Sequence, residues 1–115
     1  MEYCFDSIFV KNGKIFATGW AVSSVAENEI EITVTDEKKT PVDAIVTWAA
    51  RPDVGLAKYG DPKAGHVGIF LEIPFHGQHL VTVYFKEKNA QGNVISEQSL
   101  PLNPALIAAR KFLKE

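Results

Sequence analysis

Short segments of alternating apolar and polar residues dominate the chain, and turn residues separate them at intervals of about eight to twelve positions. Such alternation is typical of strands with one buried face. The segment 29–35 is the clearest case, because its isoleucines and valine share one face while its glutamates share the other. The pattern predicts seven strands, at 3–10, 15–22, 29–35, 42–48, 66–74, 79–87 and 94–100.

Two segments favour helix instead. The segment 52–60 has a proline at its start and a glycine at its end, which suits one or two helical turns. The segment 105–113 is rich in helix formers, with Asn103 as a cap and Pro104 at the first helical position. The complete pattern predicts an all-β fold, a seven-stranded antiparallel immunoglobulin-like sandwich with one short helix after the fourth strand and a C-terminal helix.

The chain is long enough for one hydrophobic core, since it has 115 residues. We expect residues 1–102 to form the β-sandwich domain and residues 103–115 to form a helical connector, truncated from a longer chain. Asn12-Gly13, between the first two strands, is the strongest hairpin signal, because both residues tolerate a positive φ.

Composition narrows the classes of function. Hydrophobic residues make up 46% and charged residues 23% of the chain, as in ordinary globular domains. The formal net charge of -2 gives no basic excess for nucleic acid, which we do not expect as a partner. The single cysteine, Cys4, excludes an internal disulfide and favours a cytoplasmic location. No apolar stretch approaches the roughly 20 residues of a membrane span.

Candidate catalytic chemistry is sparse, and we expect no enzyme activity, no cofactor and no metal in this chain. His76 and His79 straddle a turn and could share a metal, although a catalytic zinc needs three protein ligands. We expect them instead to be exposed turn residues. Cys4 is interpreted as a small core residue, and the paired Glu29 and Glu31 as a solvated strand face.

Aromatic residues and one polar motif remain as candidate ligand-binding positions. Trp20, Trp48 and Tyr59 can stack on sugar rings if they are exposed, whereas buried rings would only support the fold. Arg51 and Asp53, on either side of Pro52, either contact a ligand hydroxyl or fix the strand-to-helix corner. We favour the corner, in which Arg51 reaches Asp53, Asp6 or a carbonyl. If that pair is buried, removal of one partner would lower the stability of the fold by about 3–5 kcal/mol.

Several short motifs occur in an order that resembles a known family. They are Phe5-Asp6-Ser7, Asn12-Gly13-Lys14-Ile15, Gly19-Trp20-Ala21, Arg51-Pro52-Asp53-Val54 and Gly65-His66-Val67-Gly68-Ile69. Together they resemble the small β-sandwich that precedes the catalytic domain of bacterial cell-wall and rhamnan-synthesis-type glycosyltransferases. The resemblance covers residues 3–88, with 94–100 as a last strand. One departure is Gly68-Ile69, where the family often has Gly-Phe.

The resemblance implies a noncatalytic accessory module, because the nucleotide-sugar site and the acidic metal-binding motif of such enzymes lie in the downstream domain. Its partner would be a covalently linked glycosyltransferase domain, for scaffolding or for presenting acceptor glycan in cell-surface polysaccharide synthesis. The parent protein would then be cytoplasmic or associated with the membrane surface. The alternative is a carbohydrate-binding module that acts through exposed aromatic residues. An enzyme with a metal at His76 and His79 is the third hypothesis.

Overall fold

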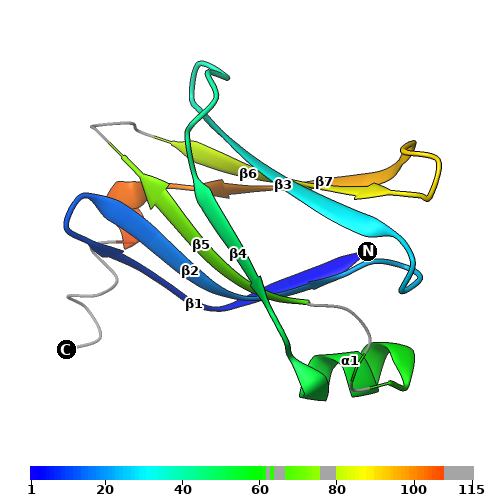
Figure 1. The fold of residues 1–115 in the computed structure, drawn as a ribbon. Helices are drawn as coiled ribbons and strands as arrows, with labels where there is room; N and C mark the ends of the chain where they lie inside the picture. Colours follow the sequence, from blue (N-terminus) through cyan, green and yellow to red (C-terminus); the bar gives the residue numbers. More distant parts are fainter. Residues whose placement is uncertain (62, 64–66, 76–79, 108–115) are drawn as a thin grey trace.

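A computed structural model describes residues 1–61, 63, 67–75 and 80–107, and it is mostly β. The chain forms two antiparallel sheets that face each other in a β-sandwich-like arrangement (Figure 1). The described residues form seven strands, as the alternation predicts. They are β1 (Glu2–Lys11), β2 (Lys14–Val22), β3 (Glu29–Asp36), β4 (Ile45–Ala49), β5 (Gly68–Pro74), β6 (Val81–Lys88) and β7 (Val94–Leu102).

The first sheet has the order β1-β2-β5-β4, and the second has the order β3-β6-β7. Asn12 and Gly13 turn β1 into β2 with φ values of 53° and 73°, which confirms the predicted Asn-Gly hairpin. A β-bulge lies between Phe5 and Ser7, so Gly19 faces Phe5 and Thr18 faces Ser7. The bulge brings the backbone of β1 so close that a Cβ on Gly19 would lie 2.7 Å from the Cα of Phe5.

The core lies between the sheets and is built by the predicted alternation. Strands β2, β5 and β6 each place every second side chain inward, and these side chains are fully buried. The stacked rings of Tyr3 and Phe85, with centroids 4.1 Å apart, join the first sheet to the second. The buried core residues are Ile15, Ala17, Ala21, Val34, Ile69, Leu71, Ile73, Val81, Val83, Phe85 and Leu102.

A short helix, α1 (Pro52–Tyr59), follows β4 and lies at the end of the molecule away from the β1–β2 turn (Figure 1). Pro52 begins it, and Gly60 ends it in the left-handed conformation with a φ of 71°. Its buried Val54 packs with Val22 and Val67, and this small cluster also includes Trp20 and Tyr59. The helix is therefore fixed to the outside of the first sheet rather than to the main core.

Two sequence expectations differ from the structure, and a third lies partly outside the described residues. The fourth strand begins at Ile45 instead of 42, because Pro41 makes only an isolated bridge to Thr35 before the chain changes sheets. Cys4 is exposed and is not a core residue, since alternation turns its neighbours Tyr3 and Phe5 inward. The predicted C-terminal helix begins at Pro104, and its continuation at 108–115 lies outside the described residues.

Candidate functional site

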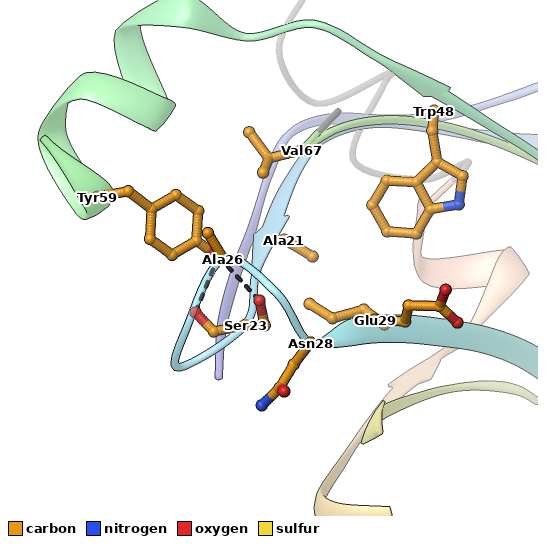
Figure 2. A pocket seen from close by; sticks show the side chains of 9 residues that line it. Ala21, Ser23, Ala26, Asn28, Glu29, Trp48, Tyr59 and Val67 are labelled. Atoms are coloured by element: carbon orange, nitrogen blue, oxygen red, sulfur yellow. Dashed lines mark hydrogen bonds between the residues drawn. The ribbon is translucent and has the colours of Figure 1, made fainter. Parts of the chain in front are cut away.

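A cleft of about 360 Å³ opens at the end of the sandwich that carries α1. Six segments meet there, namely the end of β2, the loop that leads to β3, the start of β3, the edge strand β4, the last turn of α1 and the residue before β5. Figure 2 shows the side chains around it, with the ring of Tyr59 on one side and the indole of Trp48 on the other. The lining residues are Ala21, Ser23, Ala26, Asn28, Glu29, Ile30, Trp48, Tyr59 and Val67.

Trp48 reaches the cleft from β4. It pairs with Ile69 on β5, and Ile69 points into the core, so the indole also lies on the inner side of the first sheet. The second sheet does not cover it completely, because β4 is the edge strand and the sandwich is open at this end. Trp48 is consequently half-buried and presents part of its ring to the cleft (Figure 2).

Tyr59 forms the opposite wall, and its hydroxyl is already engaged. The hydroxyl donates to the backbone carbonyl of Ser23 at 2.9 Å and lies 3.0 Å from Oγ of Ser23. Ser23 Oγ in turn donates to the carbonyl of Val25 at 2.5 Å. These bonds tie α1 to the β2–β3 loop (Figure 2), so the ring of Tyr59 is held in place and a ligand would meet its apolar surface.

The buried carboxylate of Glu87 accepts hydrogen bonds from the β2–β3 loop and fixes its position. The backbone N–H of Ser24 donates to its two oxygens at 3.0 and 3.1 Å. Ser24 Oγ and Asn28 Nδ2 both donate to Oε2 at 2.6 Å, and the amino group of Met1 lies 3.6 Å from Oε1. Glu87 has no exposed surface, so these contacts replace its hydration.

Burial by itself raises the pKa of Glu87. The hydrogen bonds from Ser24 and Asn28, together with the nearby positive charge of Met1, outweigh that effect, so the pKa lies below its ordinary value of 4.5. Glu87 therefore remains ionised at neutral pH. It positions Asn28, and with it the loop that forms one side of the cleft.

Trp20 does not share the cleft with Trp48. It pairs with Gly68 and lies on the outer face of the first sheet, under α1. The ammonium of Lys58 lies 5.3 Å from its ring centroid and also binds the carboxylate of Glu2 at 2.8 Å. The two tryptophans are thus on opposite faces of one sheet and cannot form a common platform.

Arg51 and Asp53 lie outside the cleft and form the predicted corner. The guanidinium of Arg51 donates to both oxygens of Asp53, at 3.1 and 3.0 Å, and to Asp6 at 3.2 Å. These carboxylates raise the pKa of Arg51 above its ordinary value, and Arg51 lowers the pKa of Asp53. Asp53 is 67% exposed, so the stabilisation expected for a buried pair does not apply here.

Within residues 1–61, 63, 67–75 and 80–107, no group of three or more histidine, cysteine or acidic residues is arranged to hold a metal ion. His66, His76 and His79 lie outside the described residues. Among the described residues, no helix is long and apolar enough to cross a membrane.

Sequence reasoning identified the aromatic walls of the cleft but missed its polar residues. In the sequence, Ser23 and Asn28 belong to a polar segment between two strands, and Glu29 belongs to a solvated strand face. The signal that could have found them is Glu87, because period-two alternation after Val81, Val83 and Phe85 places this carboxylate inside. A buried carboxylate needs donors, and the adjacent polar loop supplies them.

No protein-family model matches the sequence, and no curated protein matches it either.

Proposed function

We propose that this chain is a noncatalytic carbohydrate-binding module whose ligand occupies the cleft between Trp48 and Tyr59. The observation that carries the proposal is the combination of two aromatic walls with polar groups from Ser23, Asn28 and Glu29. Aromatic rings stack on the apolar faces of sugars, and a few placed polar groups bind their hydroxyls. The volume of about 360 Å³ suits one or two sugar rings.

Fluorescence provides a direct test, because the chain has two tryptophans. In a Trp20→Phe variant, Trp48 is the only fluorescent indole, and soluble oligosaccharides should change its emission in a saturable way. In the matched Trp48→Phe variant, the remaining Trp20 should not respond. Substitution of Trp48 by leucine should weaken binding by about tenfold or more without unfolding the chain. A response of Trp20 alone, or no response at millimolar glycan, would refute the proposal.

A second function, scaffolding of a linked glycosyltransferase domain, is favoured by the outer face of the first sheet. Three phenylalanine rings from adjacent strands lie together there. The centroids of Phe9 and Phe16 are 5.3 Å apart, and those of Phe16 and Phe70 are 6.0 Å apart. Phe70 is 41% exposed, which provides apolar area for packing against another domain. Presentation of acceptor glycan to such a domain would combine both functions, in a cytoplasmic or membrane-surface enzyme.

Sequencing of the reading frame on both sides of the chain tests the scaffolding proposal. A glycosyltransferase domain in the same frame would support it, and a Phe70→Ser substitution should then weaken association with that domain when the two are produced separately. A frame without such a domain would refute it.

We also propose that the sandwich has immunoglobulin-like topology. The orders β1-β2-β5-β4 and β3-β6-β7 correspond to those of the two sheets in constant-type immunoglobulin domains. An experimental structure with a different strand order would contradict this assignment.

A further inference from the structure

The described lining of the cleft carries negative charge only. Among the described residues that line it, Glu29 is the only one with a charged side chain. Figure 2 shows this side chain on the same side of the cleft as Trp48, across from Tyr59. Glu29 is exposed at the start of β3, so its carboxylate is accessible from solvent, and it lines the same cleft as Trp48.

Four positively charged groups, those of Lys88, Lys58, Arg51 and the amino terminus, are bound to other carboxylates. Lys88, which pairs with Glu29 across β3 and β6, places its ammonium 2.7 Å from Glu31. Lys58 on α1 binds Glu2 at 2.8 Å, and Arg51 binds Asp53 and Asp6 on the outer side of the corner. The amino group of Met1 lies 3.6 Å from Oε1 of the buried Glu87. Each of these positive charges is therefore already balanced by a negative one.

We infer that the cleft prefers sugars with a free amino group over their neutral or acidic counterparts; this inference rests on the proposed function. An ammonium gains from contact with an aromatic face and from pairing with a carboxylate, and Trp48 and Glu29 supply both on one side of the cleft. An acidic sugar would instead meet the carboxylate of Glu29 without a described basic residue in the lining to compensate.

Three oligosaccharides of equal length test the preference. They are the tetramer of glucosamine, the tetramer of N-acetylglucosamine and the tetramer of galacturonic acid, titrated calorimetrically at low salt and about pH 6, where an amine stays protonated. The glucosamine tetramer should bind roughly threefold to tenfold more tightly than the acetylated one. The galacturonic acid tetramer should bind most weakly, and added salt should reduce the differences.

Substitution of Glu29 identifies the cause. Glu29→Gln should bring the affinities for the glucosamine and N-acetylglucosamine tetramers within about twofold of each other, because the attraction to the ammonium is lost. Glu37→Gln is the matched control, since it removes one exposed carboxylate at the far end of β3 and should leave the preference intact.

The outcomes separate the two proposals. If sugars bind but the glucosamine tetramer has no advantage, or if Glu29→Gln preserves that advantage, the inference is wrong and the carbohydrate-binding function stands. If none of the three tetramers binds, the proposed function is refuted, and the preference is refuted with it.

Discussion

Substitution of Glu87 by glutamine should destabilise the fold far more than its conservative size change suggests. Oε2 must remain an oxygen, because it accepts from Ser24 Oγ and Asn28 Nδ2. The new NH₂ group therefore replaces Oε1, where it faces the N–H of Ser24 and the amino group of Met1. Two favourable contacts at Oε1 become contacts between donors. The three hydrogen bonds to Oε2, from the N–H and Oγ of Ser24 and from Asn28 Nδ2, lose their ionic character.

The magnitude follows from these contacts. Hydrogen bonds to a charged acceptor contribute about 1.5–3 kcal/mol, against about 0.5–1.5 kcal/mol for a neutral one. An uncompensated buried group adds a penalty of similar size, so the free energy of unfolding should fall by about 3–5 kcal/mol. A domain of this size has a total stability of about 5–15 kcal/mol. The melting temperature should consequently drop by roughly 12–20 °C.

Urea denaturation as a function of pH distinguishes this explanation from simple loss of packing. Because the folded-state pKa of Glu87 is lowered, its contribution to stability is complete above the ordinary value of 4.5 and is lost as the pH falls through the folded value. The wild-type chain should lose this contribution on acidification, whereas Glu87→Gln should lack that part of the pH dependence. Glu37→Gln, at an exposed turn, is the control and should change stability by less than about 0.5 kcal/mol. If both variants are equally stable at neutral pH, the buried network does not support the fold as described.

Two other substitutions test the fold and the cleft wall. Gly19→Ala should lower the free energy of unfolding in a denaturant titration by about 3 kcal/mol or more, because its Cβ would collide with the backbone of Cys4 and Phe5. The control Gly92→Ala, in open space with a φ of 82°, should lower it by only about 1–2 kcal/mol. Equal losses in the two variants would argue against the close approach at Gly19. Tyr59→Phe removes the hydroxyl contacts with Ser23 and should cost about 0.5–1.5 kcal/mol, while oligosaccharide affinity stays within about twofold because the ring remains. A large loss of affinity in that variant would show that the ligand contacts the hydroxyl.

The strands could be predicted from the sequence because each obeys a local rule. Alternation in β2 and β3 identified the core face, and Asn12-Gly13 identified the hairpin, since both signals come from neighbouring residues. The cleft depends on which strands are neighbours in space. Trp48 and Tyr59 come from β4 and α1, and no periodicity within either element indicates that they face one another. Cys4 is exposed because strand alternation determines the side to which it points, and the usual preference of cysteine for burial does not.

The register of the sheet, and not the aromatic content of the chain, determines which tryptophan lines the cleft. Trp20 and Trp48 belong to strands that both pair with β5, at Gly68 and Ile69 respectively. Adjacent residues of a strand point to opposite faces, so this one-residue difference in register sends one indole under α1 and the other into the cleft. Trp20 then packs with the helix that supplies Tyr59, and Trp48 lines the cleft. One ring therefore packs beneath the helix, and the other lines the cleft.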